Sequence, residues 1–169
     1  MTSSIILTGM PGCGKSTVGK ALARELAVDF CDTDDLIVSN SGERLQDTID
    51  NCGRDAFLEL ERKTILSFSP EEPLVISTGG SVVLHEDVMM HLKELGTVVF
   101  LDADLPLIRK RLWNLDSRGI IFSEGKEDIL EVYREREPLY YRYSDIRIHI
   151  NHRRTNDIVR EIIRRTQKR

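Results

Sequence analysis

Short apolar runs alternate along the chain with longer stretches in which apolar residues recur every three or four positions. The runs suit buried parallel strands, and the longer stretches suit helices that bury one face. Predicted strands cover 5–8, 28–31, 74–78, 97–101 and 146–150, and predicted helices lie near 15–27, 53–67, 86–95, 105–114, 127–141 and 155–167. This alternation predicts an α/β fold, a doubly wound parallel five-stranded sheet with helices on both faces.

Length and composition indicate one globular domain over residues 1–169. Apolar residues make up 40% of the chain and charged residues 31%, which is ordinary for a protein with a sizeable core. The net charge of −4 argues against a general nucleic-acid binder, because such proteins are usually basic. No apolar run is long enough to cross a bilayer, and no basic segment precedes the first strand. We expect a cytoplasmic monomer without a membrane or nucleic-acid partner.

The segment 153–169 is locally basic, with seven Lys and Arg residues. Ile158, Ile162 and Ile163 recur at helical spacing within it. We interpret the basic residues as the solvated face of a last helix, since its other face is apolar.

Residues 9–16, Gly-Met-Pro-Gly-Cys-Gly-Lys-Ser, match the phosphate-binding pattern G-x-x-x-x-G-K-[ST] and are called the P-loop below. They lie between a predicted strand and a predicted helix, which is the setting this pattern requires. Backbone N–H groups of such a loop wrap a polyphosphate, and the positive end of the following helix faces the anion. Lys15 is expected to reach the β- and γ-phosphates, and the Ser16 hydroxyl to bind Mg²⁺. The pattern predicts ATP and Mg²⁺ as ligands.

Three cysteines, Cys13, Cys31 and Cys52, match no zinc-binding spacing and are interpreted as unpaired thiols. Cys13 lies inside the P-loop. Its oxidation is therefore expected to inhibit nucleotide binding.

Two acidic residues and two glycines follow predicted strands and should meet the P-loop at one edge of the sheet. Asp32 and Asp34 are two positions apart, so one carboxylate can hold the hydration shell of Mg²⁺ and the other can accept a proton from a substrate hydroxyl. The alternative is that they cap a helix. Gly79 and Gly80 either permit close approach of the backbone to a ligand or form a tight turn.

A segment of weak periodicity covers 114–128 and contains two glycines. Long loops of this kind in compact domains are often lids. Arg118 lies in it, where closure would bring a cation onto the phosphates.

Glu61 and Arg136 are ambiguous when each is taken alone. Glu61 lies beside the apolar face of the helix 53–67, and a solvated carboxylate is the better interpretation of it. Arg136 has the bidentate fork that suits a carboxylate, but one arginine among several on a polar helix is usually at the surface.

Together these residues resemble the shikimate kinase family over nearly the whole chain. The resemblance rests on Gly-Met-Pro-Gly-Cys-Gly-Lys-Ser-Thr at 9–17, Asp-Thr-Asp at 32–34, Gly-x-x-x-Phe-x-x-x-Glu at 53–61, Thr-Gly-Gly at 78–80, Arg118, and Arg-x-Pro-Leu-Tyr at 136–140. It implies a small kinase of the nucleoside-monophosphate-kinase type, with substrate-binding helices at about 33–62. It also implies transfer of the γ-phosphate of MgATP to the 3-hydroxyl of shikimate.

The resemblance assigns a role to each matching position. Phosphate binding falls to Gly12, Cys13, Gly14, Lys15, Ser16 and Thr17, with Arg118 closing on ATP. Ser16 and Asp32 would hold Mg²⁺, and Asp34 would activate the accepting hydroxyl. Gly79 and Gly80 would present backbone N–H groups to the acceptor, and Arg136 would bind its carboxylate.

The chain departs from the family pattern at Arg54, Leu58, Ser81 and Gly119, where the family usually has Glu, Arg, Gly and Pro. The family arginine at position 58 is a second clamp on the carboxylate, and losing such a partner costs about 2–5 kcal/mol. Arg54 lies one helical turn before Leu58, so a relocated clamp of Arg54 and Arg136 is one explanation. Alternatively Arg54 is a surface residue, or Leu58 lines a pocket for a neutral acceptor. A kinase for another hydroxy acid or polyol, and a non-catalytic nucleotide-binding regulator, remain rival functions.

Overall fold

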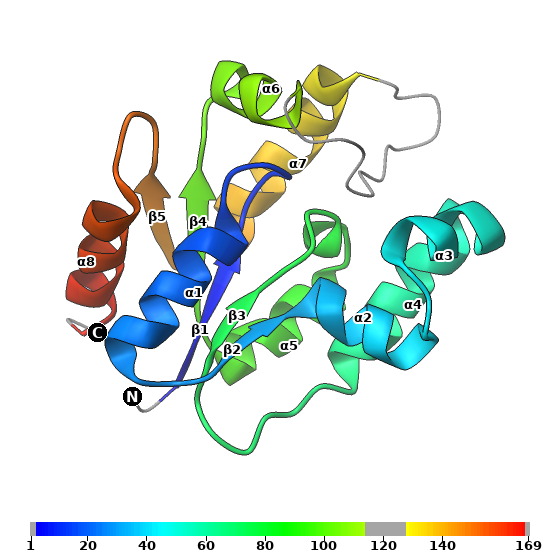
Figure 1. Cartoon of the computed structure of the whole chain (residues 1–169), viewed down its shortest axis with the longest axis horizontal. Helices are drawn as coiled ribbons and strands as arrows, with labels where there is room; N and C mark the ends of the chain where they lie inside the picture. The colour runs from blue at the N-terminus through cyan, green and yellow to red at the C-terminus, as the bar shows by residue number, and fades with distance from the viewer. Residues whose placement is uncertain (1–2, 114–127, 168–169) are drawn as a thin grey trace.

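A parallel sheet of five strands runs through the computed structural model, which describes residues 3–113 and 128–167 (Figure 1). The strands are β1 (Ser4–Thr8), β2 (Phe30–Asp32), β3 (Val75–Ser77), β4 (Gly96–Asp102) and β5 (Ile146–His149). Their spatial order is β2-β3-β1-β4-β5, and every neighbouring pair is parallel. Because β1 is central, the P-loop that follows it emerges in the middle of the sheet edge.

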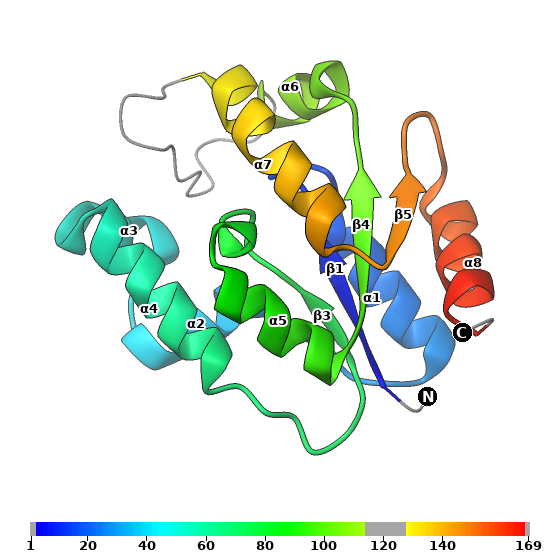
Figure 2. The ribbon, with the colours of Figure 1, turned by 180° about the vertical axis from the view of Figure 1, so that it is seen from behind.

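Helices cover both faces of this sheet. On one face lie α1 (Lys15–Leu26) and α8 (Thr155–Thr166), and on the other lie α5 (Glu86–Leu95) and α7 (Ile129–Tyr143) (Figures 1 and 2). A further helix, α6 (Leu105–Trp113), follows β4, and a short 3₁₀ turn, η1 (Val82–Leu84), follows β3. Beside the β2 edge, α2 (Thr33–Ser41), α3 (Leu45–Cys52) and α4 (Arg54–Leu66) form a separate group (Figure 1).

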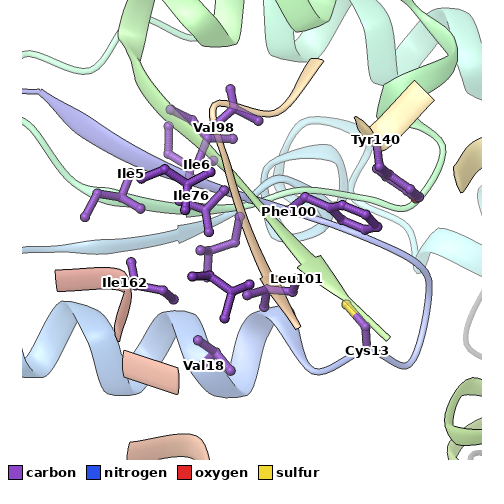
Figure 3. Packing of buried hydrophobic residues seen from close by; sticks show 14 of the residues in the cluster. Ile5, Ile6, Cys13, Val18, Ile76, Val98, Phe100, Leu101, Tyr140 and Ile162 are labelled. Carbon is purple, nitrogen blue, oxygen red and sulfur yellow. The ribbon is translucent and has the colours of Figure 1, made fainter. Parts of the chain in front are cut away.

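The main core lies between the sheet and these two helix layers (Figure 3). Ile6 of β1 is fully buried and pairs with Ile76 of β3 and Val98 of β4. Both faces of the central strands are covered, which explains why they read as continuous apolar runs rather than as alternating ones.

The predicted fold class is confirmed. The five predicted strands and six predicted helices are all present, and their ends agree with the sequence interpretation within two residues. The largest shifts, of two residues, are at the start of β2 and at both ends of α7. At β2 the backbone of Val28 closes the end of α1 instead of starting the strand. Ala27 adopts a left-handed conformation, and the Val28 N–H bonds to the Ala23 carbonyl 3.0 Å away.

The region 33–62 holds α2, α3 and the first part of α4, joined by a second apolar cluster of Ile37, Phe57 and Leu58. The predicted lid, with Arg118 and Gly119, lies outside the described residues except for Asp128, which caps α7. None of the described helices is long and apolar enough to cross a membrane.

The interpretation of the basic C-terminal segment is confirmed for the described part of it. Ile158 and Ile162 of α8 are buried, and Ile163 packs against the core from a partly buried position. Arg160 and Arg164 are exposed on the opposite face.

Candidate active site

The P-loop connects β1 to α1, and its backbone carbonyl groups contact the side chain of Lys15. Gly14 has a φ of 101°, a left-handed conformation that a residue with a Cβ rarely adopts, and α1 begins at the next residue. The Nζ atom of Lys15 donates to the carbonyl oxygens of Gly9, at 2.8 Å, and Met10, at 3.1 Å. The ammonium group is therefore held over the loop, where a bound polyphosphate would meet it.

A hydroxyl and a carboxylate meet beside the P-loop. The Ser16 Oγ donates to Oδ2 of Asp32 at 2.7 Å. The other oxygen of Asp32, Oδ1, accepts from the backbone N–H of Asp34 at 3.1 Å and so caps α2. Asp32 thus acts as a helix cap and also faces the P-loop, so the two interpretations of the sequence are compatible.

Oxygen ligands of this kind fit Mg²⁺, which keeps several waters and binds through a few protein oxygens together with phosphates. No group of three or more His, Cys, Asp or Glu residues within 3–113 and 128–167 is arranged to hold a metal by itself. A magnesium site here would therefore combine Ser16, Asp32 and the nucleotide.

A cavity of about 890 Å³ joins these groups to the next strand end. Its lining includes the P-loop from Pro11, Thr17, Asp32, Asp34, Gly79, Gly80, Arg44, Leu45, Gln46, Asp47, Arg111 and Arg153. The structure thus brings Lys15, Ser16 and Asp34 into one space.

Gly79 lies where two carboxylates approach the backbone. A Cβ on Gly79 would be 2.5 Å from Oε1 of Glu61 and 3.0 Å from Oδ1 of Asp34. Its backbone N–H donates to Oγ1 of Thr33 at 2.9 Å. The glycine is therefore needed for close packing here, and the simple tight-turn interpretation does not account for it.

Glu61 is not a solvated carboxylate, and that interpretation of the sequence was wrong. The residue is 1% exposed, and its Oε2 accepts a hydrogen bond from the Ser81 hydroxyl at 2.7 Å. Burial raises the pKa of Glu61 to about 7; the Ser81 hydrogen bond opposes the rise, the charge of Asp34 adds to it, and Arg136 opposes it. The sequence could not show that the loop 79–81 packs over this face of α4.

Arg136 is likewise buried, at 1% exposed, so the surface interpretation was wrong for it as well. It lies on α7, one turn before Tyr140, whose hydroxyl donates to the Gly80 carbonyl at 2.7 Å. Burial is the main reason why the pKa of Tyr140 is raised. Arg136 and Glu61 therefore lie in one buried charged cluster next to the loop 79–81, although neither contributes to the cavity lining.

Arg54 and Leu58 indicate that the part of the site expected to bind the acceptor differs from the family pattern. The Nη1 atom of Arg54 donates to Oδ1 of Asp55 at 3.1 Å, and Arg54 is absent from the cavity lining. Leu58 is 7% exposed and packs with Ile37 and Phe57. The sequence offers a clamp of Arg54 and Arg136 as one explanation. Neither of these two arginines lines the cavity that Asp34 lines.

Two arginines of the lining were missed by sequence reasoning. The Nη1 atom of Arg111 donates to the carbonyl oxygens of Gly12, at 3.3 Å, and Cys13, at 2.6 Å, and so braces the P-loop. Arg44 precedes α3 and lines the opposite end of the cavity. Neither residue belongs to a recognisable motif, so no sequence signal singled them out.

The cysteines are unpaired thiols, as the sequence predicts. Cys13 is 1% exposed, and its Sγ lies 3.9 Å from Nζ of Lys15. Inhibition by oxidation of Cys13 stays a prediction, and burial of the sulfur will slow such a reaction.

Similarity to known proteins agrees with this geometry. A family model described as shikimate kinase matches residues 11–167. The chain belongs to the shikimate kinase family. It is 37% identical to a shikimate kinase of Sulfurihydrogenibium sp. (strain YO3AOP1) over 98% of this chain and 99% of that protein. It is 35% identical to a shikimate kinase of Persephonella marina over 96% of this chain and 98% of that protein.

Solved structures of the shikimate kinase family share the fold. The shikimate kinase of Acinetobacter baumannii in complex with shikimate has a TM-score of 0.90 at 25% identity, covering 99% of this chain and 94% of that one. The enzyme of Aquifex aeolicus has a TM-score of 0.80 at 30% identity, covering 95% and 94%. The chain is therefore a small-molecule kinase by family, and ATP is the co-substrate of this family.

Proposed function

We propose that the protein transfers the γ-phosphoryl group of ATP to a hydroxyl of shikimate, the 3-hydroxyl by resemblance. Full-length similarity to shikimate kinases supports this function. The observation that carries it is that Asp34 lines the same cavity as the P-loop lysine and Ser16. A carboxylate that can accept a hydroxyl proton thus lines the same cavity as a loop suited to phosphates, which supports the proposal.

On the donor side, residues 12–17 bind the phosphates of ATP. Lys15 stabilises the charge that spreads over the transferring group, which is where phosphoryl transfer gains most of its rate. Ser16 and Asp32 would hold Mg²⁺, which would neutralise negative charge on the nucleotide phosphates. Arg118, in the proposed lid 114–128, is assigned to closing on ATP by resemblance alone.

On the acceptor side, Asp34 orients the hydroxyl and takes up its proton. Gly79 and Gly80 line the cavity beside Asp34, and because the Gly79 N–H donates to Thr33, the Gly80 N–H is the candidate donor to the acceptor. Arg136 supplies positive charge for the carboxylate of the acceptor. Arg54, which the sequence offers as a second cation in place of the family arginine at Leu58, is not assigned to the acceptor, because it pairs with Asp55 and does not line the cavity.

A coupled ADP-release assay with shikimate, quinate and a panel of neutral polyols tests this function. We expect turnover with shikimate and far less with the polyols. Turnover of a polyol but not of shikimate would favour the rival kinase, for which Leu58 is the supporting observation. ATP binding without turnover of any acceptor would favour a nucleotide-binding regulator.

We also propose that the protein acts as a cytoplasmic monomer. The residues proposed for catalysis all come from one chain, so no partner subunit is needed to complete the site. Light scattering at the concentrations used for the assay tests this: a stable dimer would contradict it.

A further inference from the structure

The cavity has two ends that different elements build. At one end the P-loop meets β5 and α8 through Ile150, Arg153 and Ile158. At the other end Asp34 and the loop 79–80 meet the start of α3. Figure 1 shows α8 and α3 on opposite sides of the P-loop. An acceptor whose hydroxyl contacts Asp34 must therefore extend toward α3, since the nucleotide takes up the P-loop end.

Leu58 of α4 lies in an apolar cluster and not in the lining of the cavity. Its side chain packs with Ile37 and Phe57, and Leu45 and Ile49 of α3 pack against the same cluster. Leu58 does not line the cavity, whereas Leu45 does. The apolar contact thus holds α3 against α4 and presents the beginning of α3, rather than α4, to the acceptor.

Among the described residues, four cationic ones line the cavity, and three of them are bonded to the protein itself. Lys15 donates to P-loop carbonyls, Arg111 donates to the carbonyls of Gly12 and Cys13, and Arg153 pairs with Glu161 at 2.6 Å. The fourth is Arg44, which is exposed. Within 3–113 and 128–167 no hydrogen bond or ion pair engages the Arg44 side chain.

We propose that Arg44 binds the carboxylate of the acceptor, as the second cation that the chain lacks at Leu58. This inference rests on the proposed function. The guanidinium fork matches a carboxylate in a bidentate geometry, and among the described lining residues Arg44 is the cation on the Asp34 side of the cavity. The acceptor then spans from Asp34, which takes its hydroxyl proton, to Arg44, which holds its acid group. Arg54 is not assigned to this contact, because it pairs with Asp55 and does not line the cavity.

Steady-state kinetics of Arg44→Ala test the proposal. We expect the KM for shikimate to rise about tenfold to a hundredfold, the usual effect of losing a hydrogen-bonded charge partner, while kcat and the KM for ATP stay within about twofold. Arg44→Lys keeps the charge and loses the fork, so it should recover part of the affinity. Arg54→Ala should leave the KM for shikimate unchanged.

Asp47→Asn is the matched control, because Asp47 is exposed and lines the same end of the cavity with the opposite charge. It should leave the KM for shikimate unchanged or lower it. The carboxamide analogue of shikimate completes the test: Arg44→Ala should not raise its KM further, since the group that Arg44 binds is missing.

Each outcome decides the proposal. An unchanged KM for shikimate in Arg44→Ala, or an equal rise in Asp47→Asn, would overturn it while leaving the proposed function intact. Failure of the wild-type protein to phosphorylate any acid acceptor would instead overturn the proposed function and this inference together.

Discussion

Glu61→Gln should stabilise the protein at neutral and alkaline pH and change little under acidic conditions. Burial raises the pKa of the Glu61 carboxyl from 4.5 to about 7. Between these values the folded protein retains a proton that the unfolded chain has lost. The free energy of unfolding therefore falls as the pH rises through this window, and the loss is complete above about 7.

The size of the effect follows from the shift of the pKa. One pKa unit corresponds to about 1.4 kcal/mol, so a rise from 4.5 to about 7 amounts to about 3 kcal/mol in full. Glutamine has the shape of the protonated acid, carries no charge, and keeps an oxygen that can accept the hydrogen bond from Ser81. It therefore removes the titration while keeping the packing.

Urea unfolding of wild type and Glu61→Gln between about pH 5 and pH 8 measures the difference. The stability of the variant relative to wild type should grow by about 2–3 kcal/mol across this range. Glu71→Gln is the control, because Glu71 is exposed, and it should follow wild type at every pH. A difference between wild type and Glu61→Gln that does not vary with pH would refute the reasoning, since Glu61 would then be ionised in the folded protein throughout.

Three further predictions concern activity. Lys15→Ala should keep the fold by circular dichroism and lose about 10²-fold or more in turnover; retention of a tenth of the activity would contradict the role given to the P-loop. Asp34→Asn should lower kcat far more than ATP affinity, whereas Asp32→Asn should raise the Mg²⁺ concentration needed for half-maximal rate; equal effects on Mg²⁺ dependence would contradict the division of roles. Arg136→Ala should raise the KM for the acceptor strongly with little effect on the KM for ATP. An unchanged KM for the acceptor in Arg136→Ala would contradict the role given to Arg136.

The sheet and the nucleotide-binding part of the site could be predicted from the sequence, because each requires particular residue types at fixed positions. Buried parallel strands need apolar runs, and a phosphate loop needs glycines at fixed spacing before Lys and Ser. The strand pattern predicted that Asp32 and Asp34 lie at the same edge of the sheet as the P-loop, and the family resemblance assigned Asp32 to Mg²⁺ together with Ser16. Local sequence therefore carried enough information for this half of the site.

The residues of the proposed acceptor site are brought together by packing between segments that are distant in the sequence. The local pattern of apolar and polar residues does not predict such packing. Glu61 is buried because the loop 79–81 crosses α4, and its partner Ser81 is twenty residues away. Arg136 is buried although it lies among polar residues of α7. Arg44 carries no motif, and its importance appears only when the lining of the cavity is known.

The most direct test of the account is a competition in one reaction. The protein is incubated with ATP, Mg²⁺ and equal concentrations of shikimate, quinate and neutral polyols, and the phosphorylated products are identified by mass spectrometry. The account predicts shikimate phosphate as the dominant product, formed in step with ADP. Unmodified shikimate beside another phosphorylated acceptor, or ADP without any phosphorylated acceptor, would contradict it.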